Sequence, residues 1–391
     1  MGYTLSRTQL LFDLYVAFEC AKHNKSNKSY VRNFESNLNQ NLNKLCDELY
    51  ERRYKPQPSV CFIITDPKKR EIFAANFRDR VVHHLYYNYT YELFNSTFIE
   101  DSYSCRIGKG IHYGVERLYK HIRSVTDNFH KEGYVLKMDI KGYFVHINRY
   151  KLLDIANNVL DKMALHKSRS NGLKYIDIID YEFVHYLNEI LILTDPTDGC
   201  IFKSDISEWN DLPRSKSQFF TDKWCGIPIG NLTSQLFSNV YLNVLDQYMK
   251  RVLKLKHYGR YVDDFYVVSE TKDKLKEIIP NITSFLKKEL FLDINQGKTQ
   301  IKSTKHGVSF IGGYIKPHRI YVSNSTINRI SKKINTIHLN EPEYIEASIN
   351  SMLGIFSHYK SNTVKCQIMN KNKELKFIGY FDEDYNHFNI F

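Results

Sequence analysis

Two adjacent aspartates, Asp263 and Asp264, constrain the structure of this 391-residue chain more than any other feature. They stand between two β-prone runs, which predicts a β-hairpin over 258–269 with the acids at its tip. Adjacent carboxylates repel each other, so bringing them together is unfavourable unless they share a cation. Because Mg²⁺ prefers carboxylate oxygens and water, the pair predicts a metal site. The alternative interpretation is an acidic turn on the surface.

A third acid, Asp139, lies at the end of an apolar run that predicts a strand over 134–140. By the alternation of a strand, Leu136 and Met138 face one side, while Lys137 and Asp139 face the other. An unpaired buried carboxylate is costly, so the side that carries Asp139 is expected to face a cleft. Two-metal phosphoryl transfer uses carboxylates from separate strands, and Asp139 and Asp263 can supply them.

Two further segments suit a nucleotide pocket. Phe144 follows Asp139 by five residues and could close against the 2′ position of an incoming sugar, excluding ribonucleotides. Gly226 and Gly230 lie in a loop over 226–235, where glycine allows close approach of the backbone to a flat base pair. The alternatives are a core phenylalanine and a plain loop that caps a helix.

The composition indicates which class of molecule the chain binds. Lysine and arginine number 55 against 43 acids, a net charge of +12, which favours nucleic acid first and an acidic membrane surface second. The seven cysteines form no C-x-x-C pair, which argues against a zinc ribbon and fits reduced thiols. The N-terminus has no secretory pattern, and no apolar run approaches the ~20 residues of a membrane span. We therefore expect a soluble cytoplasmic protein.

The remaining patterns are mostly helical. One helical face is expected to carry Phe34, Leu38, Leu42, Leu45 and Leu49. A strand is expected at 60–65, and helices are expected around Val81–Tyr86, at 184–193, at 232–252, at 272–290 and twice after residue 320. The polar stretch 195–223 is expected to be a long loop or insertion.

In order and spacing, these segments resemble the reverse transcriptase family over about residues 50–320. Asp139 with Phe144 resembles motif A, Gly226–Gln235 resembles motif B, and Tyr261–Asp264 matches the Y-x-D-D of motif C. The resemblance implies an α+β, right-hand polymerase fold with fingers, a palm with an antiparallel sheet, and a helical thumb. The implied boundaries are 1–130 for the N-terminal helices and fingers, 131–315 for the palm with an insertion at about 195–223, and 316–391 for the thumb and C-terminal tail.

The resemblance also assigns roles to single residues. Lys298 lies in a stretch that resembles motif D, whose lysine acts as a general acid on the leaving pyrophosphate. Gly312 belongs to a turn that resembles the primer grip, and Arg70 is the expected triphosphate contact. The metal ligands implied for two Mg²⁺ ions, with Mn²⁺ as a substitute, are Asp139, Ile140, Asp263 and Asp264. The implied nucleotide and nucleic-acid contacts are Lys69, Arg70, Arg78, Phe144, Ile229, Gly230, Ser234, Gln235, Tyr261, Gly312, Arg329, Lys332 and Lys333.

Motif B indicates a subgroup. Most relatives carry Gln-Gly-x-x-x-Ser-Pro, whereas the matching residues here are Ile229, Gly230, Ser234 and Gln235. This form resembles the reverse transcriptases of diversity-generating retroelements. That resemblance implies mutagenic retrohoming, in which a template-repeat RNA is copied with errors at adenines and the cDNA enters a target gene. The implied partners are an RNA template, a DNA or RNA primer, dNTPs and a small basic protein, the accessory variability determinant.

Three alternatives remain. An antiviral defence reverse transcriptase would be distinguished by its genomic neighbours. A group II intron-type maturase predicts Gln at position 229 and Pro at position 235, and both are missing. A catalytically silent RNA-binding scaffold is disfavoured by the intact acids Asp139, Asp263 and Asp264.

Overall fold

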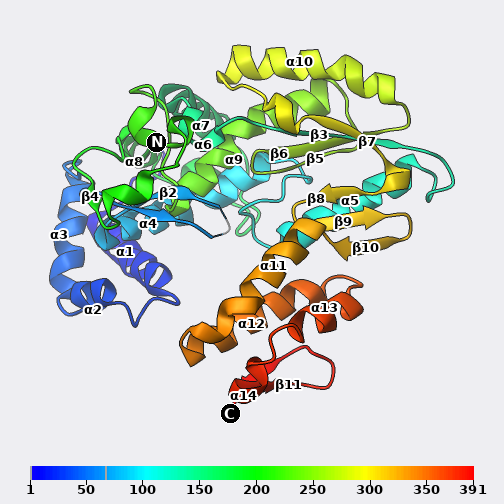
Figure 1. The fold of residues 1–391 in the computed structure, drawn as a ribbon. Helices are drawn as coiled ribbons and strands as arrows, with labels where there is room; N and C mark the ends of the chain where they lie inside the picture. The colour runs from blue at the N-terminus through cyan, green and yellow to red at the C-terminus, as the bar shows by residue number, and fades with distance from the viewer. Residues whose placement is uncertain (1, 67) are drawn as a thin grey trace. The chain divides into compact units, whose positions relative to one another are not determined.

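The computed structural model describes residues 2–66 and 68–391 (Figure 1). The chain divides into two compact units, each assembled from separate stretches of sequence. Unit 1 comprises 1–100, 140–254 and 282–294, and unit 2 comprises 101–139, 255–281 and 295–391. Each unit has its own hydrogen-bonded sheets, and the expectation of a mixed α+β class is confirmed.

Unit 1 begins with three helices, α1 (Arg7–Lys22), α2 (Ser29–Glu35) and α3 (Leu38–Tyr50). The expected apolar face is divided between α2 and α3, because the chain turns between them. Leu42, Leu45 and Leu49 on α3 are buried as that pattern requires. Helix α1 packs along α4 (Phe77–Thr97), whose buried residues include the expected Val81 and Val82.

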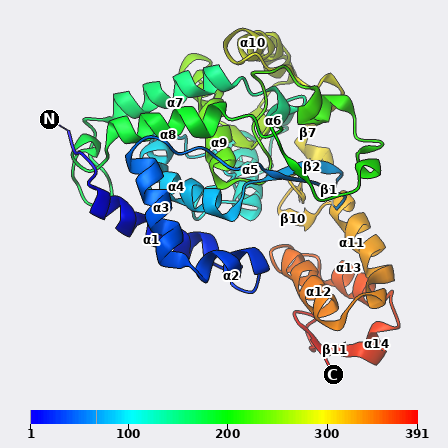
Figure 2. The same ribbon diagram turned by 90° about the vertical axis from the view of Figure 1, so that its left-hand side faces the viewer.

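Among the other helices of unit 1, α8 and α9 match predicted segments, whereas α6 and α7 were not predicted. Helices α4 and α7 pack against α9. Figure 2 shows α7 and α8 side by side, and residue contacts between them agree. Their bounds are α6 (Tyr143–His146), α7 (Arg149–Met163), α8 (Tyr181–Leu193) and α9 (Leu232–Gln247). The helix expected over 232–252 is confirmed, with its last turn, Tyr248–Val252, in the π form.

A three-stranded sheet in unit 1 has the order β2-β1-β4. Strands β1 (Val60–Ile64) and β2 (Arg70–Ala74) are antiparallel, and β4 (Ile201–Phe202) is parallel to β1. The expectation that 195–223 is simply a loop was therefore wrong in part. A two-residue strand is too short to show a period, and its partner is distant in the sequence. Between β4 and α9 the segment also forms three 3-10 turns: Ile206–Trp209, Arg214–Lys216 and Gln218–Phe220.

Unit 2 contains a four-stranded antiparallel sheet with the order β5-β6-β3-β7. Its strands are β3 (Tyr134–Asp139), β5 (Tyr258–Tyr261), β6 (Asp264–Ser269) and β7 (Gln300–Ser303). The hairpin predicted over 258–269 is thus confirmed as β5 and β6. Helix α5 (Ile111–Val125) covers one face, where Leu118, Ile122, Val135 and Tyr266 share a buried core.

A second sheet of unit 2 has the order β10-β9-β8, and helices follow it. Ile330, Ile334 and Ile337 are buried with Ile345 and Ile349, which confirms the two amphipathic helices predicted after residue 320. The bounds are β8 (Val308–Phe310), β9 (Gly313–Lys316), β10 (Arg319–Val322), α11 (Asn324–Thr336), α12 (Pro342–Ser357), α13 (Asn362–Met369), α14 (Leu375–Ile378), β11 (Gly379–Phe381) and β12 (Phe388–Ile390). Helix α10 (Lys272–Leu290), predicted over the same residues, contributes its first part to unit 2 and its last part to unit 1.

Within residues 2–66 and 68–391, no helix combines the length and apolar character needed to cross a bilayer.

Candidate active site

Strand pairing in unit 2 brings two of the expected catalytic acids opposite each other. In the register of β3 against β6, Asp139 is the partner of Asp264. Partners in an antiparallel ladder project to the same face of the sheet. Val135 on β3 is paired with Val268 on β6 on the same face, nearer the start of β3, and both belong to the buried core. The face therefore changes from apolar at Val135 to acidic at Asp139.

Asp263 lies in the tight turn between β5 and β6, after a strained residue. Val262 has φ +53°, a conformation that a β-branched side chain rarely adopts. Backbone strain of this kind gathers at functional sites, where surrounding contacts hold it in place. Here the buried Arg260 donates through Nη1 to the carbonyl of Val262 at 3.0 Å and through Nη2 to Ser102 Oγ at 3.2 Å. Sequence reasoning missed Arg260, although a cation between apolar strand residues is a recognisable signal.

A buried polar network fixes β6 from the side of α5. The hydroxyls of Tyr266 and Tyr103 are 2.7 Å apart, and Tyr266 also contacts Nδ1 of His121 at 3.1 Å. Tyr103 donates to Asp101 at 3.1 Å, and Arg117 Nε donates to the same carboxylate at 2.7 Å. Because satisfied buried networks rigidify their surroundings, β6 and the turn before it are held firmly.

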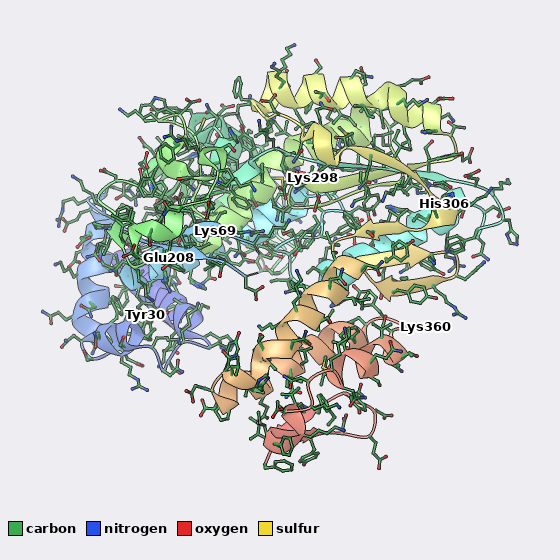
Figure 3. The ribbon with its side chains drawn as sticks, in the orientation of Figure 1. Tyr30, Lys69, Glu208, Lys298, His306 and Lys360 are labelled. Atoms are coloured by element: carbon green, nitrogen blue, oxygen red, sulfur yellow. The ribbon has the colours of Figure 1, made fainter. Side chains whose placement is uncertain are left out.

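Lys298 is the cation that contacts the acidic face. Its Nζ lies 2.7 Å from Oδ2 of Asp139, which is only 5% exposed. Lys298 ends the 3-10 turn Gln296–Lys298, just before β7, and is labelled in Figure 3. Asn295 donates its side-chain amide to Oδ1 of Asp139 at 3.2 Å and its backbone N–H to the Asp139 carbonyl at 2.8 Å. Burial lowers the pKa of Lys298, but its hydrogen bond to Asp139 and the nearby carboxylate charges outweigh burial and raise it overall.

The charge on Asp263 is disfavoured. Burial, followed by the charges of Asp264 and Asp139, raises the pKa of Asp263 to about 7. Lys137 is half-buried near these acids, and burial lowers the pKa of its ammonium. Near neutral pH the Asp139 carboxylate is therefore paired with Lys298, and the Asp263 carboxyl is partly protonated.

The carboxylates of Asp139, Asp263 and Asp264 are ligands that suit a hard divalent cation, although the described residues do not form a complete coordination site. In the described part of the chain, no three acidic, histidine or cysteine side chains already converge where a metal ion could sit. Three carboxylates nevertheless gather at the paired ends of β3 and β6, and Mg²⁺ prefers such ligands. Lys298 pairs with the Asp139 carboxylate, so a cation held by that carboxylate would compete with the ammonium. Ile140, the fourth expected ligand, is buried and forms a β-bridge with Ile294.

The residues expected to form the nucleotide pocket lie in unit 1. The backbone N–H of Ile227 donates to the Phe144 carbonyl at 2.9 Å, and that of Phe73 donates to the Ile229 carbonyl at 3.2 Å. Gly230 has φ +130°, and a Cβ there would lie 3.1 Å from Ile72, so this position favours glycine. The structure thus brings Phe144, Ile229 and Gly230 into one assembly on the edge of β2.

The expected cations of unit 1 differ in their surroundings. Arg70 is exposed at the start of β2, as a triphosphate contact requires. Lys69 is half-buried and donates to the carbonyl of Asn210. Arg78 forms ion pairs with Glu48 and Asp79, which favours a structural role over contact with a ligand.

The remaining expected contacts are spread over both units. Ser234 is buried and Gln235 is exposed on the first turn of α9. In unit 2, Tyr261 is half-buried at the end of β5, and Gly312 has φ +92° between β8 and β9. On α11, Arg329 and Lys332 are exposed and Lys333 lies over the ring of Tyr344, 5.2 Å from its centroid.

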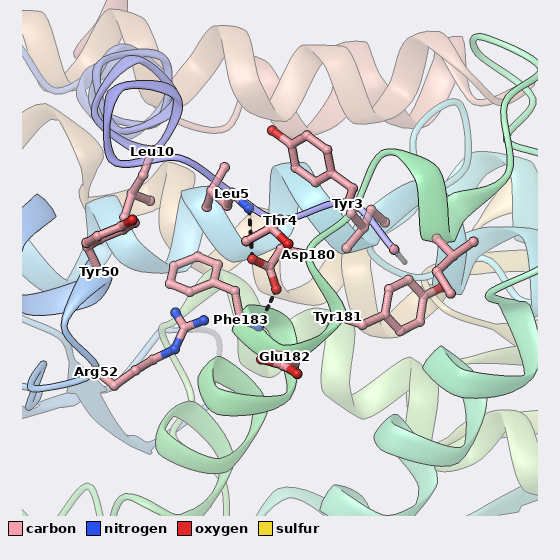
Figure 4. A pocket seen from close by; sticks show the side chains of 13 residues that line it. Tyr3, Thr4, Leu5, Leu10, Tyr50, Arg52, Asp180, Tyr181, Glu182 and Phe183 are labelled. Carbon is pink, nitrogen blue, oxygen red and sulfur yellow. Dashed lines mark hydrogen bonds between the residues drawn. The ribbon is translucent and has the colours of Figure 1, made fainter.

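A cavity of about 540 Å³ in unit 1 does not involve these residues (Figure 4). The N-terminal segment and the start of α8 line it. Asp180 accepts hydrogen bonds from the backbone N–H groups of Leu5 and Phe183, each at 2.9 Å. Asp180 in this cavity therefore caps the N-terminus of α8, and no predicted catalytic residue lines the cavity.

Comparison with known proteins identifies a domain. The family model for reverse transcriptase (RNA-dependent DNA polymerase) matches residues 183–315, which include Asp263, Asp264 and Lys298. Protein YkfC of Escherichia coli (strain K12) is 24% identical over 347 residues, 80% of this chain and 79% of that protein. The putative COX1/OXI3 intron 2 protein of Saccharomyces cerevisiae is 39% identical over 64 residues, 16% of this chain and 8% of that protein.

Solved structures similar to this chain include telomerases. Telomerase from Candida albicans with a fragment of telomeric RNA has a TM-score of 0.47 at 12% identity, covering 84% of this chain and 60% of that one. Apo telomerase from Candida tropicalis gives a TM-score of 0.47 at 12% identity, covering 83% and 61%. This chain therefore spans about 60% of the length of those telomerase chains. The expected α+β class is confirmed by the sheets, and over residues 183–315 the family model supports the expected enzyme class, RNA-directed DNA polymerase.

Proposed function

Because this chain carries a reverse transcriptase domain, we propose that it synthesises DNA on an RNA template at the cluster of Asp139, Asp263, Asp264 and Lys298. The observation that carries the proposal is the pairing of Asp139 with Asp264 across β3 and β6, with Lys298 Nζ 2.7 Å from Asp139. Acids on two paired strands beside a lysine match the needs of nucleotidyl transfer, in which charge develops on both the attacking and the leaving oxygens.

Asp139, Asp263 and Asp264 would hold two Mg²⁺ ions, which supply charge neutralisation and activate the 3′-hydroxyl of the primer. Lys298 has the chemistry of a general acid. Its raised pKa keeps a proton on Nζ, and that proton can pass to the leaving pyrophosphate. Asn295 holds the Asp139 carboxylate in place through its side-chain amide, and Arg260 holds the turn that carries Asp263.

The residues gathered on the edge of β2 are proposed to form the wall of the nucleotide pocket. Phe144 would exclude the 2′-hydroxyl, and Arg70 would contact the triphosphate. The backbone of Phe144 is bonded to the same loop that carries Ile229 and Gly230, which supports a common role.

We also propose the finer role of error-prone cDNA synthesis in a diversity-generating retroelement. It is supported by Ile229 and Gln235, which stand where most relatives have Gln and Pro. Isoleucine offers no hydrogen-bond donor or acceptor to an incoming nucleotide. The corresponding partners would be a template-repeat RNA and a small basic accessory protein.

A second candidate, an intron-associated function, is favoured by one observation, the local similarity to a putative intron 2 protein. It covers 16% of this chain, and the residues at 229 and 235 weigh against it.

One experiment separates the general proposal from the finer one. The purified chain is given an annealed primer, an RNA template that contains all four bases, dNTPs and Mg²⁺, and its cDNA is sequenced. Extension with errors concentrated opposite adenine supports both proposals. Faithful extension removes the retroelement role and leaves the polymerase, whereas absence of extension contradicts the polymerase itself.

A further inference from the structure

We propose that the 195–223 segment positions the wall of the nucleotide pocket, and that Gln218 is its principal positioning residue. The inference rests on the proposed function, because it assigns a role toward the incoming nucleotide. It concerns only contacts within unit 1.

The segment is fastened to β2 through a single buried carboxylate. Glu71 on β2 is 4% exposed and accepts three hydrogen bonds from the segment. Trp209 Nε1 and Ser217 Oγ donate to its Oε1 at 2.7 and 2.8 Å, and the backbone N–H of Gln218 donates to Oε2 at 2.7 Å. Bonds to a charged acceptor are stronger than neutral ones, so residues 209–218 are firmly tied to β2.

Gln218 also contacts the loop that carries Ile229, so it connects this loop to Glu71. Its side chain is 8% exposed, and its Nε2 donates to the Ile227 carbonyl at 2.6 Å. The N–H of the same Ile227 donates to the Phe144 carbonyl. Gly226 has φ +91°, and a Cβ there would lie 3.1 Å from Oε1 of Gln218, so the two fit closely together.

Three hydrogen bonds hold the loop at Ile227 and Ile229, and the backbone N–H of Gly226 also donates to the Ile147 carbonyl. Phe144 accepts from Ile227, Gln218 donates to Ile227, and Phe73 on β2 donates to Ile229. The ring of Phe219, next to Gln218, also lies 5.5 Å from the ring of Phe73. Removing the contact from Gln218 leaves the Ile227 carbonyl without this donor, while the backbone bonds of Gly226, Ile227 and Ile229 remain. The loop is then held less tightly, and the acids of unit 2 are unchanged.

The test compares Gln218→Met with Gln247→Met. Methionine resembles glutamine in shape and cannot donate the hydrogen bond. Gln247 is a matched control because its Nε2 also donates to a backbone carbonyl in unit 1, that of Thr97 at 3.0 Å, away from the loop. Both variants lose an amide-to-carbonyl bond, and Gln247→Met also loses the side-chain contacts of Gln247 with Asn243 and Arg251. A general loss of stability should therefore be at least as large in the control.

Steady-state extension should show a KM for dNTP about fivefold higher in Gln218→Met, with a smaller change in kcat and weaker discrimination against ribonucleotides. Gln247→Met should retain the wild-type values. Trp209→Phe keeps the ring and removes one donor to Glu71, so it should shift KM in the same direction by less. Equal KM and equal sugar discrimination in the wild type and Gln218→Met would overturn the inference.

Hydrogen exchange of the backbone amides at 226–231 gives a readout that does not depend on activity. Exchange there should be faster in Gln218→Met than in Gln247→Met or the wild type. If no form of the enzyme extends a primer, the proposed function fails, and exchange alone decides whether Gln218 holds the loop. Unchanged exchange then refutes the positioning role.

Discussion

Lys298 Nζ lies 2.7 Å from the carboxylate of Asp139, so a lysine holds the most buried acid of the candidate active site. Burial, followed by the charges of Asp264 and Asp139, raises the pKa of the neighbouring Asp263 to about 7. The Lys298 ammonium and partial protonation of Asp263 thus reduce the charge of the acidic cluster near neutral pH. Divalent cations would replace both, which couples metal binding to pH.

The first prediction concerns the stability of the metal-free protein. The folded pKa of Asp263, about 7, lies above its ordinary value, so the folded state binds more protons between those two values. The contribution of Asp263 to stability is therefore fully present in acid and is lost as pH rises through about 7. Asp263→Asn cannot titrate and should lack this loss. Because the loss accrues between the ordinary pKa of 3.8 and about 7, urea unfolding in a chelator at pH 4.5 and pH 7.5 checks it. Equal pH slopes for the two proteins would contradict the assignment.

The second prediction concerns the choice of sugar. Phe144→Ala should raise incorporation of ribonucleotides, because the ring no longer fills the space at the 2′ position. Extension with single dNTPs and rNTPs measures the ratio of their kcat/KM values. Tyr143→Phe is the control, because it keeps the neighbouring ring and removes its hydroxyl, which donates to the Ser238 carbonyl. If the ratio is the same in wild type and Phe144→Ala, Phe144 is a packing residue.

The third prediction concerns nucleic-acid binding. Affinity for an RNA–DNA duplex should fall steeply with salt, with a log–log slope of roughly −0.7 to −0.9 for each phosphate contacted. Reversing the charge of the exposed Arg329 and Lys332 on α11 should weaken binding and flatten that slope, with little change in sequence preference. The same reversal at the exposed Lys288 on α10 serves as the control. Affinity that does not depend on salt would argue against binding through phosphates.

The fourth prediction concerns fidelity. Ile229→Gln adds a donor and an acceptor, so it should lower misincorporation by about fivefold, most visibly opposite template adenine. Ile229→Leu changes shape and adds no hydrogen bond, so it should retain the wild-type error spectrum. Sequencing of cDNA made on one RNA template compares the three. If Ile229→Gln only reduces activity and leaves the spectrum unaltered, Ile229 packs beneath the loop without influencing fidelity.

Local patterns predicted much of this fold. The β5–β6 hairpin follows from acids between β-prone runs, and α10 was predicted within its observed bounds because its apolar period is regular. Contacts between distant segments could not be predicted in this way. Glu71 and Gln218 meet only after β2 and the 195–223 segment have folded together, and neither belongs to a period.

The candidate site shows the same division. Asp139 and Asp263 were recognisable from their strands, whereas the contact between Lys298 and Asp139 depends on how β7 pairs with β3. Arg78 appears from the sequence to be free for a ligand, but Glu48, on a helix far earlier in the chain, pairs with it. The charge of a residue can thus be predicted from the sequence, whereas the residue that pairs with it can be identified only in the folded structure.

RNA-templated primer extension by Asp139→Asn and Asp263→Asn in Mg²⁺ tests the central claim most directly. Each change removes one charged ligand and keeps the side-chain size, so nucleotide addition should be nearly abolished while the circular dichroism spectrum stays that of the wild type. Asp273→Asn on α10 removes an exposed acid paired with Lys276 and should extend normally. Extension by Asp263→Asn at the wild-type rate would contradict the account.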